Sequence, residues 1–226
     1  MDIRRIAGSV MQGLLPPLGE FPAPLMKTVA TAASLQGKVI PHFSTERVIT
    51  TLFHKEPDRV PVTTIMCSAA RQILGISFPE FSQSAEKAAD VFMAGYEFVG
   101  GDVIVLLWDL SVEAGDFGQE LVFPLDSTPR PNYDKPLVQG VEDYYMIRPI
   151  PYESSVRMKE FVRLCELMAK RVGFRAIVGG FVFGPLGVLS MMRGAEKMFK
   201  DCVTNRKAVI HACAAINETL LEFVQA

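Results

Sequence analysis

An apolar run in this sequence ends on a carboxylate that could do chemistry. Residues 103–107 are all apolar, and Trp108 and then Asp109 follow them. Runs that are apolar on both faces are typical of strands in parallel sheets covered by helices, and in barrels of that kind the residues after the strands line the active site. The pattern therefore makes Asp109 the first candidate for a catalytic residue. The structural alternative is that Asp109 caps the following helix or pairs with a nearby base.

The composition favours a small-molecule substrate over a nucleic acid or a membrane. The chain has 226 residues, of which 49% are hydrophobic and 21% charged, and its net charge is -2. Its basic residues form no long run, so the sequence lacks the basic patch that is typical of a nucleic-acid binder. The four cysteines lack paired spacing, which argues against a disulfide framework and fits a cytoplasmic protein. Gly and Pro interrupt the apolar stretch near the N-terminus too early for a signal peptide or a membrane span.

The elements that must position Asp109 alternate along the chain after about residue 45. Strands are predicted at 60–66, 102–107, 120–123 and 176–181. A helix is predicted from the N-cap Ser84 to the Gly100-Gly101 pair, another from Ser154 or Ser155 to Gly173, and a last one from about 205 to 226. Such alternation predicts parallel βαβ units and leaves a barrel and a doubly wound sheet open.

The number of residues after the extension limits what kind of barrel this chain could form. A complete barrel of eight units takes about 250 residues, which is more than residues 46–226 provide, so a barrel would be incomplete. Residues 1–45 are rich in Ala and Pro and lack a long periodic run, and we interpret them as an extension that packs on the domain. An open barrel exposes an apolar edge, so we expect the chain to self-associate, to need a missing partner segment or to aggregate.

With the strand ends placed, the sequence resembles the uroporphyrinogen decarboxylase superfamily, which includes methyltransferases that move a methyl group from a corrinoid protein to a thiol. The resemblance covers residues 44–226. It rests on the order and spacing of short motifs, which are 56–62 (EPDRVPV), 109–114 (DLSVEA) with Phe117-Gly118, and 184–187 (GPLG) with 193–196 (RGAE). It implies an incomplete TIM-type (β/α)8 barrel with about four or five βα units, spanning 46–226 after the extension.

The resemblance also assigns site residues. Asp109 matches the carboxylate that faces the pyrrole nitrogens in the decarboxylases, and Phe181 matches an aromatic residue of the pocket wall. Arg71 matches the second arginine of the loop that binds the substrate carboxylates, although it could equally be a surface residue at a helix start, and Cys67 replaces the first arginine. A porphyrinogen has many carboxylates, and each one left unpaired would be costly. The loss of an arginine therefore favours the methyltransferase branch.

That branch implies a zinc ion, which binds and deprotonates the acceptor thiol, and a corrinoid on a partner protein. The zinc ligands of the family are a His-x-Cys pair and a later Cys in the second half of the barrel, beyond the part that this sequence matches. We therefore expect either a fragment or a truncated relative. Methyl transfer between a corrinoid and a thiol is the first functional hypothesis. Decarboxylation of uroporphyrinogen to coproporphyrinogen is the second, and a non-catalytic binding or scaffold protein is the third.

The only His-x-Cys in the chain, His211-Ala212-Cys213, is predicted not to be this zinc signature. It lies in the predicted last helix, where a step of two residues turns the side chains about 200° apart and prevents them from holding one ion. We therefore expect no tight one-to-one zinc binding by this chain in a calorimetric titration. Tight binding that is lost in His211→Ala would contradict both this interpretation and the helix.

Overall fold

The computed structural model describes residues 44–173 and 175–226, so the predicted extension lies outside the described residues except for its last two. The described residues fall into two compact units, one that ends at Pro61 and one that runs from Val62 to Ala226. The first contains helix α3 (Ser44–Leu52), and here the Arg47 guanidinium donates to both carboxylate oxygens of Asp58 at 2.7 Å. The second contains the sheet and the candidate site.

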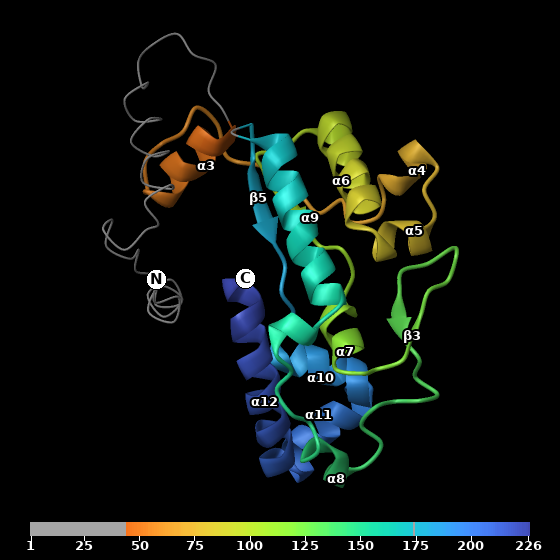
Figure 1. Cartoon of the computed structure of the whole chain (residues 1–226). Coiled ribbons are helices and arrows are strands. Elements are labelled where there is room, and N and C mark those ends of the chain that lie inside the picture. The colour runs from red at the N-terminus through yellow and green to blue at the C-terminus, as the bar shows by residue number, and fades with distance from the viewer. Residues whose placement is uncertain (1–43, 174) are drawn as a thin grey trace. The chain divides into compact units, whose positions relative to one another are not determined.

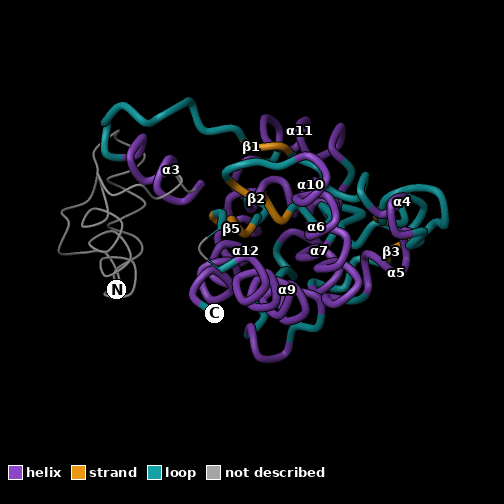
Figure 2. The backbone as a smooth tube through the Cα atoms, turned by 90° about the horizontal axis from the view of Figure 1, so that it is seen from above, coloured by secondary structure: helices purple, strands orange, loops and turns teal. Residues whose placement is uncertain are grey.

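Three parallel strands form the sheet of the second unit, which confirms the predicted α/β class (Figure 2). They are β1 (Thr63–Thr64), β2 (Val103–Leu106) and β5 (Ile177–Gly180), in the order β1-β2-β5. The register pairs Thr64 with Ile104 and Leu106 with Gly180. Their carboxyl ends therefore lie along one edge of the sheet, where the fold brings together segments far apart in the sequence.

The prediction of four or five βα units is wrong for the described residues, which provide three parallel strands. The segment expected as a strand at 120–123 forms β3 (Leu121–Val122), which pairs antiparallel with β4 (Arg130–Pro131) in a separate two-stranded sheet. The reason is the length of the connection. A parallel pair needs a crossover of a dozen or more residues, usually a helix, whereas a short turn brings the chain back antiparallel.

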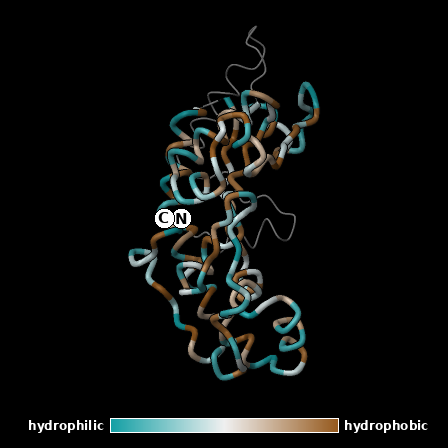
Figure 3. The backbone as a smooth tube through the Cα atoms, turned by 90° about the vertical axis from the view of Figure 1, so that its right-hand side faces the viewer, coloured by the Kyte–Doolittle hydropathy of each residue, from teal (hydrophilic) through white to brown (hydrophobic). Residues whose placement is uncertain are grey.

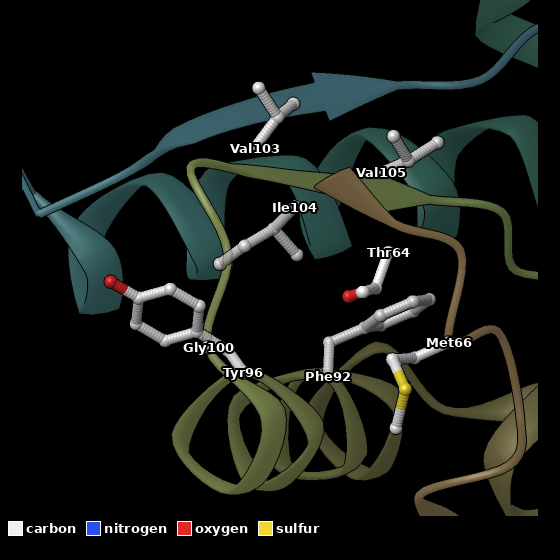
Figure 4. A pocket seen from close by; sticks show the side chains of 8 residues that line it. All are labelled: Thr64, Met66, Phe92, Tyr96, Gly100, Val103, Ile104 and Val105. Atoms are coloured by element: carbon white, nitrogen blue, oxygen red, sulfur yellow. The ribbon is translucent and has the colours of Figure 1, made fainter. Parts of the chain in front are cut away.

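Helices α6 (Ala85–Val99) and α9 (Arg157–Val172) pack against each other and against the sheet (Figure 1). Because parallel crossovers are right-handed, consecutive helices cover the same face of the sheet. Ile104 points toward α6, whereas Val103 and Val105 point to the opposite side (Figure 4) and are only half-buried. The expectation that β2 is buried on both faces is therefore wrong. A crevice of about 10 Å³ between β2 and α6 has room for no more than a water molecule.

Several helix boundaries agree with their sequence signals. The Ser84 hydroxyl accepts the Lys87 N–H at the start of α6, which ends at Gly100 with a φ of 77°. Helix α9 ends at Gly173, where φ is 58°, a value that favours glycine. The last helix, α12 (Arg206–Gln225), matches the predicted range closely. These signals are local, and the structure confirms them.

The remaining helices are α4 (Arg71–Leu74), α5 (Phe78–Gln83), α7 (Val112–Asp116), α8 (Val141–Tyr144), the 3-10 turn η2 (Tyr152–Ser154), α10 (Pro185–Arg193) and α11 (Ala195–Thr204). Of these, α7, α8, α10 and α11 lie beyond the carboxyl end of β5, whereas α4 and α5 lie beside α6 (Figure 1). Hydrophobic and hydrophilic residues alternate at short intervals along much of the backbone (Figure 3), as expected where amphipathic helices share a core. Among the described residues, no helix combines the length and the apolar character that a membrane crossing requires.

A buried carboxylate joins three of these helices. Asp201 on α11 accepts hydrogen bonds from the Tyr144 hydroxyl on α8 and from the Arg193 Nε on α10, each at 2.9 Å. Asp201 is 5% exposed, so its charge depends on these partners for compensation. The arginine of the RGAE motif therefore has a structural partner in this protein.

The N-terminus of α9 is capped from a distance, so the predicted cap at Ser154 or Ser155 is wrong. The helix begins at Arg157, and its first N–H groups donate to the Asp116 carboxylate at the end of α7. The three N···O distances, from Val156, Arg157 and Met158, lie between 2.8 and 3.0 Å. A negative charge at this end of a helix also interacts favourably with the helix dipole.

We expect Asp116→Ala to lower the free energy of unfolding by about 1 to 2 kcal/mol, the usual cost of losing an N-cap. Asp116→Asn should cost less, since it keeps one acceptor oxygen. Urea denaturation measures both, and Asp134→Ala is the matched control because Asp134 lies in an exposed loop. Equal midpoints for wild type and Asp116→Ala would contradict the cap.

Candidate functional site

Asp109 lies just beyond the carboxyl end of β2, where the sequence predicted it, and is 8% exposed. Its Oδ2 accepts from the Arg157 Nη2 at 2.6 Å, and its Oδ1 accepts from the Ser111 N–H at 2.7 Å. Asp109 therefore has the basic partner that the structural alternative anticipated. A role in catalysis stays a prediction.

Arg157, the partner of Asp109, is held on several sides. It is the first residue of α9, and its Nη2 also donates to the Ser82 carbonyl at 3.2 Å. Its guanidinium carbon lies 5.8 Å from the Trp108 ring centroid and 5.5 Å from that of Phe123, within the range of cation–π attraction. The Trp108 indole is fixed in turn by a hydrogen bond to the Phe81 carbonyl. The guanidinium therefore has little freedom to leave Asp109.

A second buried carboxyl, Glu113, lies beside this ion pair. Glu113 is on α7, is 3% exposed, and accepts the Phe183 N–H at 2.7 Å. Burial raises the pKa of Glu113 to about 7, and the charge of Asp109 acts in the same direction, while the Phe183 hydrogen bond and Arg157 oppose the shift. Near neutral pH this carboxyl therefore exchanges a proton easily, as a general acid or base must.

The sequence reasoning missed Glu113 and Arg157 as site residues. Glu113 stood inside the motif at 109–114, but nothing in its own pattern indicated a raised pKa. Arg157 lies 48 positions after its partner Asp109, and no local signal connects the two. The one usable hint was that a second acid follows Asp109 by four residues, a spacing that keeps two side chains close when the intervening segment is helical.

The two other predicted residues follow the neighbouring strands. Phe181 comes directly after β5, and its ring centroid is 6.1 Å from that of Phe183, so this segment reaches the site through the Phe183 N–H. Arg71 follows β1 on α4, with its guanidinium carbon 3.8 Å from the Phe78 ring centroid and a hydrogen bond to the Ile76 carbonyl. These contacts of Arg71 are local. A substrate role for either residue stays a prediction.

The described residues do not fit the zinc that the methyltransferase branch implies. Among them, no three His, Cys, Asp or Glu side chains are grouped so that they could hold a metal ion. His211 and Cys213 both lie on α12, so the helix predicted for them is confirmed. His211 is exposed beside the Tyr145 ring at a centroid distance of 5.3 Å, whereas Cys213 is half-buried.

Comparisons with known proteins agree with the fold. The family model described as uroporphyrinogen decarboxylase (URO-D) matches residues 43–226. No curated protein matches the sequence. Among solved structures, a methyltransferase from Methanosarcina mazei is similar with a TM-score of 0.65 and 19% identity, over 80% of this chain and 54% of that one. The chain thus spans about half of that relative, and the likeness confirms the predicted TIM-type barrel in incomplete form.

The raised pKa of Glu113 predicts how stability depends on pH. The folded-state pKa of about 7 lies above the ordinary 4.5, so between these values the folded protein keeps a proton that the unfolded chain has lost. The resulting stability is complete below the lower value and is lost as the pH rises to the higher one. A shift of this size corresponds to about 3 kcal/mol.

Glu113→Gln keeps an acceptor for the Phe183 N–H and removes the titration. Urea midpoints measured from about pH 5 to about pH 8 should fall in the wild type and stay flatter in this variant. Glu120→Gln is the matched control, because Glu120 is exposed and pairs only at the surface with Asn132 and Lys135. Parallel pH profiles for wild type and Glu113→Gln would contradict the raised pKa.

Proposed function

Since the chain belongs to the uroporphyrinogen decarboxylase family, we propose that it takes part in methyl transfer between a corrinoid protein and a small thiol. The thiol would bind at the carboxyl ends of β2 and β5, beside Glu113 and the aromatic pair Phe181–Phe183. In α/β barrels this end of the strands is the place where substrates bind.

This choice rests on the contacts that two arginines near the strand ends make within the protein. Arg71 lies on the Phe78 ring and donates to the Ile76 carbonyl, and Arg157 is bound to Asp109 and to the Ser82 carbonyl. Arg157 is therefore committed to Asp109, and Arg71 is held by contacts within its own segment. A porphyrinogen would need several guanidinium partners in a buried site, whereas a small thiol needs none. The geometry therefore supports the methyltransferase reading more than the decarboxylase reading.

Glu113 has the properties of the base that such a transfer needs. The thiol proton would pass to the Glu113 carboxylate as a sulfur–carbon bond forms to the methyl group. The bond between the methyl carbon and the corrinoid metal breaks, and its electron pair remains on the corrinoid. A carboxyl with a pKa of about 7 can take this proton at neutral pH, whereas an ordinary glutamate is a much weaker base.

In this proposal Asp109 and Arg157 act through Glu113. The Asp109–Arg157 ion pair lies beside Glu113, and the negative charge of Asp109 helps to keep the pKa of Glu113 high. Phe181 would form the apolar side of the thiol site. Arg71, which lies after the neighbouring strand, would have at most a contact with the distal end of the substrate.

Decarboxylation of uroporphyrinogen is the second candidate. The family whose model matches is described by this reaction, and Asp109 lies at the strand end where the decarboxylase-type carboxylate is expected. In that reaction Asp109 would stabilise the protonated pyrrole, which requires its carboxylate to turn from Arg157 to the substrate. The short Asp109–Arg157 distance of 2.6 Å makes this turn costly, so the reaction ranks second.

An anaerobic assay with the whole chain tests the choice. The protein is mixed with methylcobalamin and 2-mercaptoethanol, and the methyl thioether is measured by mass spectrometry against the uncatalysed rate. Uroporphyrinogen is supplied in a parallel reaction, and the carboxylates of the product are counted by chromatography. We expect thioether formation, and a drop of about 100-fold or more in Glu113→Gln, the usual contribution of a general base. Glu120→Gln should be unaffected.

Two other results would contradict the proposal. Decarboxylation of uroporphyrinogen that is lost in Asp109→Asn, without thioether formation, would establish the second candidate. Failure of both reactions with a folded protein would favour the non-catalytic reading. Circular dichroism of each variant separates loss of function from loss of fold.

A further inference from the structure

Helices α10, α11 and α12 pack against one another and leave a concave surface between them. A groove of about 370 Å³ opens between the start of α10, the end of α11 and the first half of α12. Pro185 and Leu186 line it from α10, and Val209 and Ile210 line it from α12. Leu186 is 47% and Ile210 56% exposed, so apolar surface is left open to solvent. The volume is in the lower range of small-molecule sites.

One charged residue lines this apolar groove. Arg206 is exposed, and within the part of the chain that the structure describes it makes no ion pair, hydrogen bond or ring contact. It precedes Val209 by three residues and Ile210 by four on α12, so the guanidinium shares a helix face with the apolar wall. Guanidinium matches a carboxylate in shape and charge and can donate two parallel hydrogen bonds to it.

We propose that this groove binds a free carboxylate with one apolar chain, such as a medium-chain fatty acid, with the carboxylate on Arg206 and the chain against Pro185, Leu186 and Ile210. The apolar wall of the groove would contact the alkyl chain of the ligand, and the Arg206 guanidinium would pair with the ligand carboxylate. The small volume favours a single molecule over a polypeptide or a membrane surface. This site shares no residue with the proposed methyl-transfer site and does not depend on it.

Two thiols in the same groove provide a local readout. Cys202 reaches it from α11 and Cys213 from α12, and both are partly exposed. Burial raises the pKa of the Cys213 thiol, and the nearby Cys202 adds to the shift. A neutral thiol behaves as a small apolar group, which suits the wall of such a site. A ligand in the groove would shield both thiols from alkylation.

The test uses octanoate and its uncharged analogue 1-octanol as probes with the whole chain at low protein concentration. Octanoate should bind more tightly and should slow the reaction of Cys202 and Cys213 with N-ethylmaleimide, followed by mass spectrometry, while Cys67 serves as an unprotected reference. Arg206→Gln should weaken octanoate about fivefold, the worth of an exposed ion pair near 1 kcal/mol, and leave octanol unchanged. Lys207→Gln removes a neighbouring charge outside the groove and should change neither.

Ile210→Ser keeps the charge and removes part of the wall, so it should weaken both probes. Equal affinity for octanoate and octanol, or an octanoate affinity that Arg206→Gln does not change, would overturn the proposal. Protection of the two cysteines that appears without any probe when the protein concentration is raised would show that a second copy covers the groove, and would also overturn it. None of these results bears on the methyl-transfer assay.

Discussion

The candidate site is governed by the cost of burying charge, because two carboxyl groups share a single guanidinium. An ionised carboxylate in a buried position is stable only with a partner. Arg157 supplies that partner to Asp109 at 2.6 Å, and Glu113 is left with the Phe183 N–H as its main compensation. Glu113 therefore holds a proton up to about pH 7. Glu113 owes its ability to exchange a proton near neutrality to burial and to the way its neighbours are paired.

The position of Arg157 depends in turn on contacts at the ends of helices. Asp116 on α7 binds the first N–H groups of α9, and Glu160 on α9 accepts the Ala85 N–H at the start of α6. Each carboxylate thus holds the N-terminus of a neighbouring helix. Helix α7 carries Glu113 as well as Asp116, which caps α9. The helix that presents Glu113 therefore also fixes the helix whose Arg157 pairs with Asp109. Local stability and the electrostatics of the site are therefore coupled.

The sheet itself is asymmetric. Helix α6 packs on β2 and helix α9 on β5. On β2, Ile104 and Leu106 are buried, while Val103 and Val105 on the other side are half-buried. In a TIM-type barrel the first side faces the surrounding helices and the second faces the barrel interior. The three parallel strands of the described residues therefore have the two-sided burial expected in such a barrel.

The sequence by itself determined the α/β class, the family, the helices at 84–99 and near the C-terminus, and the place of Asp109 after a strand, because periodicity, Ser84 and the glycines act over a few residues. The same signals could not show that 121–122 pairs with 130–131, that Asp116 caps α9, or that Arg157 meets Asp109. Those outcomes were decided by the tertiary structure, since each joins residues that only the packing of distant elements brings within hydrogen-bond distance. The pKa of Glu113 was decided in the same way, because burial and neighbouring charge exist only in the folded chain.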